Sequence, residues 1–155
     1  MSRGLGGISM ALANRNYRLY TYGAIPSLLG TWIQRMAVGW LAWELTQSGS
    51  WLGLVAFADL APTVITAPIA GAFADRLNRL KMVRLIQLLT MMQASALAAL
   101  TLSGYMTIEI LVFLAFIQGS IQGIHQPFRQ SLVGSMVSKE EITAAIGINS
   151  TIWNT

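Results

Sequence analysis

Two charged residues, Arg35 and Asp59, lie inside long apolar stretches of the chain. A charge within hydrocarbon is costly, so such residues usually pair with one another or mark the path of an ion or substrate. If the turn between the stretches centres on Gln47, Arg35 lies twelve residues before it and Asp59 twelve after it. Antiparallel helices then hold both side chains at similar depth. We favour a structural ion pair; the alternative is that Arg35 meets an anionic substrate, with Asp59 as its resting partner or a proton carrier.

Polar side chains recur at helical spacing within two of the apolar stretches. A polar stripe on a membrane helix faces neighbouring helices or water rather than lipid. Such a stripe forms either the wall of an aqueous cavity or a set of hydrogen bonds inside a packed bundle, and the sequence favours neither. The first stripe contains Ser27, Thr31, Gln34 and Arg35, and the second contains Gln118, Gln122, His125 and Arg129.

A short polar run, residues 71–81, joins two of the apolar stretches. We expect Gly71 to lie at the end of the preceding helix, where a side chain would push a neighbouring helix away. Small residues four apart, the pairs Gly119 with Gly123 and Ala67 with Gly71, predict further close helix contacts. The charged residues of the run are Asp75, Arg76, Arg79 and Lys81.

The composition is typical of an integral α-helical membrane protein. Of the 155 residues, 54% are hydrophobic, the mean hydropathy is +0.57, and the apolar residues form blocks long enough to cross a bilayer. We expect an all-α fold in which residues 1–18 form a cytoplasmic amphipathic segment and residues 19–155 an incomplete transmembrane half-domain. The predicted spans are 19–43, 51–74, 82–102 and 108–126, with a fifth from about 142 that is cut off at Thr155, so we expect a longer protein.

Several classes of function conflict with the residue content. The sequence has no Cys and one His, which excludes disulfides and a His-cluster metal site. It has no phosphate-binding glycine motif and no hydrolase triad, so we expect no enzyme, no cofactor and no metal. Nine of the ten basic residues fall on one side of the predicted membrane, which explains the basic balance without a nucleic-acid partner. The same asymmetry predicts a cytoplasmic N-terminus.

The run at 71–81 has the pattern G-x-x-x-D-R-x-x-R-x-K. This pattern resembles the loop between the second and third transmembrane helices of the major facilitator superfamily. The family usually has Gly where this chain has Asn78, and Asn is the next-best residue for a left-handed turn. Other segments resemble the branch of bacterial multidrug-type and siderophore exporters, the enterobactin-exporter-like or transmembrane secretion effector proteins. These segments are residues 14–18, 30–35, 127–130, 137–142 and 145–150.

This resemblance implies the first four transmembrane helices, and the start of a fifth, of a major-facilitator-type bundle in the bacterial inner membrane. It implies a secondary active transporter that exports a small organic molecule by alternating access. The implied partners are the lipid bilayer, the substrate, a missing C-terminal transporter half and protons as a candidate coupling ion. Asp75 and Arg76 would form part of a cytoplasmic latch to that half. In the superfamily the first and fourth helices line the cavity, which makes candidate substrate contacts of Ser27, Thr31, Gln34, Arg35, Gln118 and Gln122.

An alternative class is a small four-span membrane scaffold or assembly factor without transport activity. The fifth apolar run argues against it. Drug–proton antiporters of the superfamily often carry an Arg in helix four, three residues before a Gln-Gly. Here Gly119 precedes Gln122 and Ala115 precedes Gln118 at that spacing, so the device is absent from this sequence.

Overall fold

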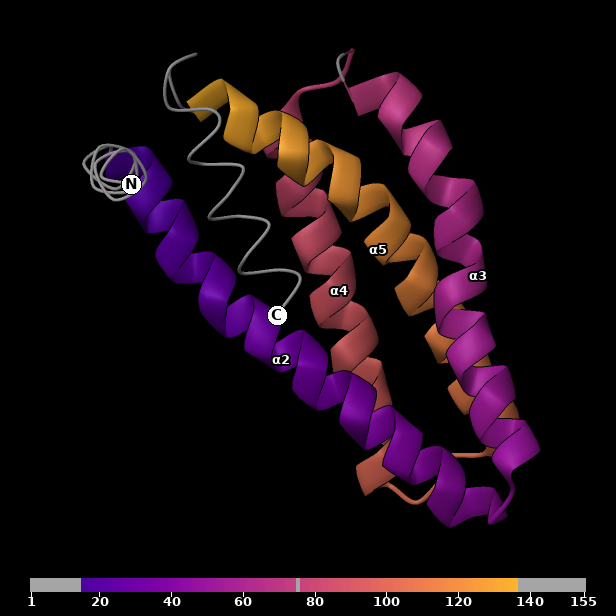
Figure 1. Cartoon of the computed structure of the whole chain (residues 1–155). Coiled ribbons are helices and arrows are strands. Elements are labelled where there is room, and N and C mark those ends of the chain that lie inside the picture. Colours follow the sequence, from indigo (N-terminus) through magenta and orange to yellow (C-terminus); the bar gives the residue numbers. More distant parts are fainter. Residues whose placement is uncertain (1–14, 75, 137–155) are drawn as a thin grey trace, which may run out of the picture. The chain divides into compact units, whose positions relative to one another are not determined.

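Four long helices make up the described part of the chain, residues 15–74 and 76–136 of a computed structural model (Figure 1). They are α2 (Arg15–Thr46), α3 (Gly49–Ala74), α4 (Arg79–Leu102) and α5 (Ile108–Met136). These residues contain helices and short connections but no strand. The expected all-helical fold is therefore confirmed.

Three of the helices are long and apolar enough to cross a membrane: α3, α4 and the Ile108–Leu132 part of α5. The longest helix, α2, is not among them, because Gln34 and Arg35 lower the hydropathy of its central turns. An apolar membrane helix can carry such residues where they contact other helices rather than lipid.

Two helix boundaries differ from the sequence expectations. Helix α2 begins at Arg15, so residues 15–18 belong to the same helix as the first expected span, which we began at residue 19. Helix α5 continues past Pro127 to Met136, ten residues beyond the expected end of the span at residue 126. Membrane helices tolerate a proline where neighbouring groups satisfy the freed backbone, and the buried Phe128 extends the packed face of α5 beyond it. Residues 1–14 and the expected fifth span lie outside the described residues.

The chain divides into two compact units. One unit comprises Met1–Ile33 and Gln130–Thr155, and its described part contains the first turns of α2 and the last turns of α5. Within it, the Thr31 hydroxyl donates to the Ser27 carbonyl oxygen at 3.0 Å. The other unit, Gln34–Arg129, holds the end of α2, the whole of α3 and α4, and most of α5.

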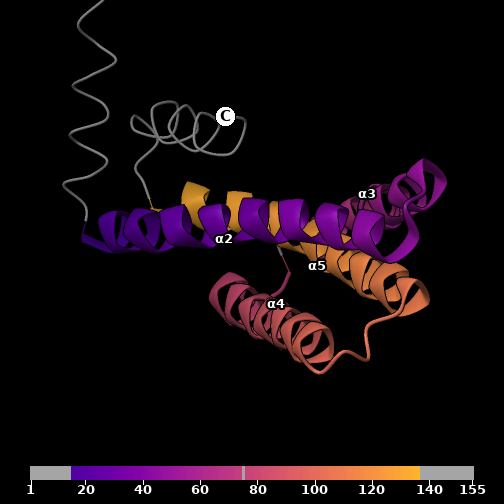
Figure 2. The same ribbon diagram turned by 90° about the horizontal axis from the view of Figure 1, so that it is seen from below.

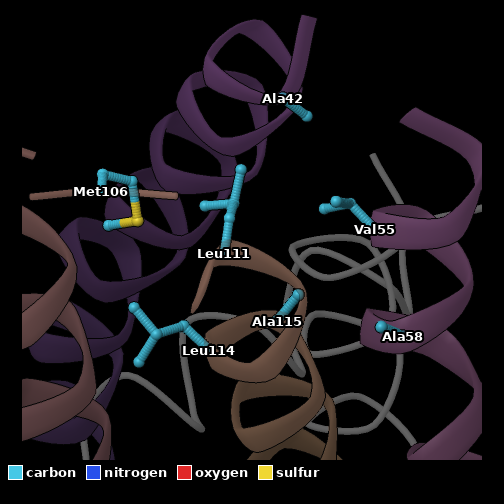
Figure 3. Packing of buried hydrophobic residues seen from close by; sticks show 7 residues of the cluster. All are labelled: Ala42, Val55, Ala58, Met106, Leu111, Leu114 and Ala115. Carbon is cyan, nitrogen blue, oxygen red and sulfur yellow. The ribbon is translucent and has the colours of Figure 1, made fainter. Parts of the chain in front are cut away.

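In the Gln34–Arg129 unit, α5 packs against both α3 and α4 (Figures 1 and 2). One apolar cluster lies toward the end where α2 turns into α3 and α4 turns into α5; Figure 3 shows its members converging. A second cluster lies toward the connection between α3 and α4. The first contains Ala42, Val55, Ala58, Met106, Leu111, Leu114 and Ala115. The second contains Ala70, Ala74, Ile86, Ile121 and Phe128.

Helices α3 and α5 cross at close range. A Cβ atom at Gly119 would overlap the backbone of Asp59, and one at Gly123 would overlap the Thr66 hydroxyl and crowd the backbone of Thr63. The close contact expected for this pair of glycines is therefore confirmed. The corresponding expectation for Gly71 is wrong for the described residues, because a Cβ there meets no atom within 4 Å.

Asn78 has a different role from the one we expected. Its φ and ψ are −68° and 102°, which is extended backbone, so it does not adopt a left-handed turn. It is the N-cap of α4, and its side-chain oxygen accepts a hydrogen bond from the Lys81 backbone N–H at 3.1 Å. The expectation failed because Asn also satisfies the orphan N–H groups at a helix start, which glycine cannot do with a side chain.

The α3–α5 crossing predicts a contrast between two glycines. Gly119→Ala should lower the unfolding temperature of the purified full-length protein, because overpacking typically costs about 1–3 kcal/mol. Gly71→Ala is the matched control and should leave the temperature unchanged or raise it, since Ala favours helix over Gly. Thermal unfolding in detergent, followed by tryptophan fluorescence, measures both. Equal melting of the two variants would contradict the close crossing.

Candidate functional site

Arg35 on α2 and Asp59 on α3 form an ion pair, with Arg35 Nε and Asp59 Oδ2 3.2 Å apart. The helices turn at Gln47 and Ser48, and Gln47 adopts a φ of 49° there. A connection this short keeps the two helices antiparallel and in fixed register, which brings positions equidistant from the turn together. Burial is unequal, since 40% of the Arg35 side chain but 17% of the Asp59 side chain is exposed. The guanidinium therefore partly covers the more deeply placed carboxylate.

A second polar contact joins α2 to α4 and then to α5. The Gln34 amide donates from Nε2 to Gln93 Oε1 at 2.9 Å. The Gln93 amide in turn donates from Nε2 to the backbone oxygen of Leu114 at 3.2 Å. Gln93 is buried, so its amide needs these partners.

A further contact joins α3 to α5, where the Thr63 hydroxyl donates to the backbone oxygen of Gly119 at 2.9 Å. The four contacts form a closed polar ring that runs from α2 to α3, α5, α4 and back to α2. Its members lie at similar depth: Gln93 is eleven residues before Gly104, and Leu114 is ten residues after it. We call this set the polar ring: Gln34, Arg35, Asp59, Thr63, Gln93, Leu114 and Gly119.

The sequence reasoning did not select Gln93 and Thr63. Gln93 is the more informative omission, because it contacts two other helices with one side chain. Its signal was a lone amide among the apolar residues of α4 between Gln87 and the helix end. Such an amide in a membrane helix predicts an interhelical hydrogen bond. Thr63 had a weaker signal, since a threonine can also bond within its own helix.

The polar stripe of α5 lies mostly inside the Gln34–Arg129 unit. Gln118 and Arg129 are buried there, and Gln122 and His125 are half-buried. Gln118 Oε1 and Asp59 Oδ1 are buried acceptors that have no hydrogen-bond partner in the part of the chain that the structure describes. Both oxygens can therefore accept a further hydrogen bond, and both belong to residues in or next to the polar ring.

The remaining predicted cavity residues, Ser27 and Thr31, belong to the other compact unit. The structure places them on one face of α2, joined by the hydrogen bond described above. Their contribution to a common cavity with Gln118 and Gln122 stays a prediction.

The basic turn between α3 and α4 is built around the Asn78 cap. The backbone N–H of Arg76 donates to the Phe73 oxygen at 3.0 Å, which closes the end of α3. Arg76 and Lys81 are exposed, and Arg79 is the first residue of α4. Gly71 lies one turn earlier and is also exposed. Asp75 lies outside the described residues.

Charge is segregated between the two ends of the Gln34–Arg129 unit. The α3–α4 end carries four cations within nine residues, Arg76, Arg79, Lys81 and Arg84. The opposite end, where α2 meets α3 and α4 meets α5, carries Glu44 and Glu109. No group of three potential metal-ligating side chains occurs among the described residues.

These features define a polytopic helical membrane protein with a polar centre between apolar helices and a basic turn at one end. Residues 9–155 match the family model described as transmembrane secretion effector. The chain therefore belongs to this transporter family of the major facilitator superfamily.

A curated relative is the staphyloferrin A transporter of Staphylococcus aureus (strain NCTC 8325 / PS 47), which is 26% identical over 127 residues. The match covers 81% of this chain and 32% of the relative, so the chain spans about a third of the length of that transporter. No solved structure matches the chain.

The ion pair predicts non-additive effects of removing its two charges. Arg35→Ala and Asp59→Ala should each lower the stability of the full-length protein by about 1–3 kcal/mol, less than for a fully buried pair because the guanidinium is partly exposed. The double variant should be more stable than the sum of the single losses implies. Thermal unfolding of the four proteins in a double-mutant cycle measures the coupling. Strictly additive losses would show that the contact contributes nothing.

Proposed function

We propose that the chain is the N-terminal part of a secondary active transporter that exports a small organic molecule by alternating access. The observation that carries the proposal is the polar ring in a chain of this transporter family. In alternating access, one half of the transporter rocks against the other around a site near the middle of the membrane. A half-bundle that moves as a body needs its helices held together at that depth, and the ring supplies one polar contact at each helix junction.

In this proposal Arg35 and Asp59 are structural partners first. The alternative is that the guanidinium also contacts an anionic substrate, which the partial exposure of Arg35 permits. Gln34, Gln118 and Gln122, with Ser27 and Thr31, are the proposed polar contacts of the substrate cavity. Protons are the proposed coupling ion, with Asp59 as the carboxylate within the membrane span that could carry one.

A charge swap separates the two roles of Arg35. The full-length protein with Arg35→Asp and Asp59→Arg keeps opposite charges at both positions and should keep near-normal abundance. If the pair is structural, the swapped protein should also retain most of its transport activity. Staphyloferrin A, the compound named for the relative, is the first probe, and its efflux from cells that express the protein is the measurement.

Loss of efflux in the swapped protein at normal abundance would assign Arg35 to the substrate. If the unaltered protein does not export staphyloferrin A, the efflux assay is repeated with other small organic compounds. If the full-length protein moves none of them, the transporter proposal fails and a scaffold role becomes the better account.

We further propose that the basic turn is cytoplasmic and that Asp75 is part of a latch to the second half of the transporter. The clustering of Arg76, Arg79, Lys81 and Arg84 supports the orientation, since cytoplasmic loops carry an excess of basic residues. Asp75 is an acid among these cations, which favours a specific contact over simple charge balance. The bacterial inner membrane is the corresponding proposed location.

One set of variants tests the orientation and the latch together. The chain has no Cys, so single cysteines at Ser48 and Leu77 give unique labelling sites, and Leu77 leaves the Asn78 cap intact. An impermeant thiol reagent added to intact cells should label position 48 and spare position 77. Asp75→Asn should leave this labelling and the abundance unchanged while it lowers efflux several-fold. Labelling of position 77 would show the opposite orientation. Normal efflux of the Asp75→Asn variant at normal abundance would contradict the latch.

A further inference from the structure

An apolar groove of about 760 Å³ runs between α2 and α4 within the Gln34–Arg129 unit. From α2 it is lined by Trp40, Leu41 and Glu44, among others, and from α4 by Leu97 and Leu102 with small side chains between them. One end of the groove reaches Gln34 of the polar ring, and its other end reaches Glu44. Neither the ring nor the basic turn gives a role to the stretch between Trp40 and Glu44.

The groove carries a single charge. Glu44 is the only acidic residue among its lining side chains, and none of them is basic. Glu44 forms no salt bridge with any of the described residues. Trp40 lies four residues before Glu44 on the same helix, so the two side chains share a face, and 71% of Trp40 is exposed. A carboxylate beside an accessible indole ring is suited to an ammonium group.

The groove also has the dimensions of a lipid chain. It extends along α2 from Gln34 to Glu44, which at a rise of about 1.5 Å per residue is about 15 Å. The hydrocarbon core of a bilayer is about 30 Å thick, so the groove is about one leaflet deep. Glu44 lies two residues before the end of α2 at Thr46, where head groups and the interfacial tryptophans Trp40 and Trp43 are found in a membrane protein.

We propose that this groove binds a phospholipid with a primary ammonium head group, such as phosphatidylethanolamine. One acyl chain lies between Leu41 of α2 and Leu97 of α4, and the ammonium group contacts the Glu44 carboxylate and the Trp40 indole. The proposal is independent of transport, since it depends only on the groove and its one charge. An anionic phospholipid such as phosphatidylglycerol is disfavoured, because its head group would face the Glu44 carboxylate.

Native mass spectrometry of the purified full-length protein tests the head-group preference. Phosphatidylethanolamine and phosphatidylglycerol with the same acyl chains are titrated into the protein in detergent. The unaltered protein should retain the ethanolamine lipid about tenfold better, as expected for one charge-assisted contact. Glu44→Gln should abolish most of this preference. Glu109→Gln is the matched control, an acid at the same end of the unit outside the groove, and should preserve it.

A second variant tests the groove itself. Ala98 lines the wall formed by α4, and Ala98→Trp should fill the space and reduce retention of both lipids, with unchanged elution in size-exclusion chromatography as evidence of folding. Equal retention of the two lipids by the unaltered protein would overturn the proposal. So would a preference that survives Glu44→Gln, or retention that is unaffected by Ala98→Trp, which would show that another segment or molecule fills the groove.

Discussion

Polar groups within a membrane-spanning bundle must find their partners inside the protein, because hydrocarbon offers none. In the Gln34–Arg129 unit this constraint takes the form of the polar ring. The ring joins the helices through two side-chain amides, an ion pair and a hydroxyl, and two of its hydrogen-bond acceptors are backbone oxygens. Individual interhelical hydrogen bonds in membranes contribute only about 0.6 kcal/mol on average. The ring therefore does more to select which helices meet, and in which register, than to supply stability.

Close packing and the polar ring depend on each other. Gly119 lets the backbones of α3 and α5 approach, and the same residue offers its carbonyl oxygen to Thr63. A larger residue at that position would separate the helices and also lengthen the hydrogen bond. Apolar clusters on either side of the ring, several of whose members are alanines, complete the contact between the helices. Dispersion between small residues thus sets the distance at which the polar contacts become geometrically feasible.

The sequence predicted the helical architecture and the depth of Arg35 and Asp59, because hydrophobic block length and distance from a short turn are local properties. It did not predict that Gln93 of α4 would contact both α2 and α5, since this depends on how the helices pack in three dimensions. It placed the end of the fourth span at residue 126, whereas α5 continues through Pro127 to Met136 with Phe128 buried, because tertiary packing also decides where a helix ends. Asn78 was misread because asparagine suits both a left-handed turn and an N-cap, and residue type alone does not distinguish them.

The placement of the ring bears on how such a bundle could move. Its contacts use α2 and α5 at their middle turns. Each of those helices is tied to its neighbours on both sides, so neither can shift alone without breaking a polar contact in a medium that offers no replacement. The turns at Gln47 and Gly104 lie at one end and the basic turn at the other, where water can satisfy polar groups. A displacement that leaves the ring intact is therefore one in which the helices of this unit move together.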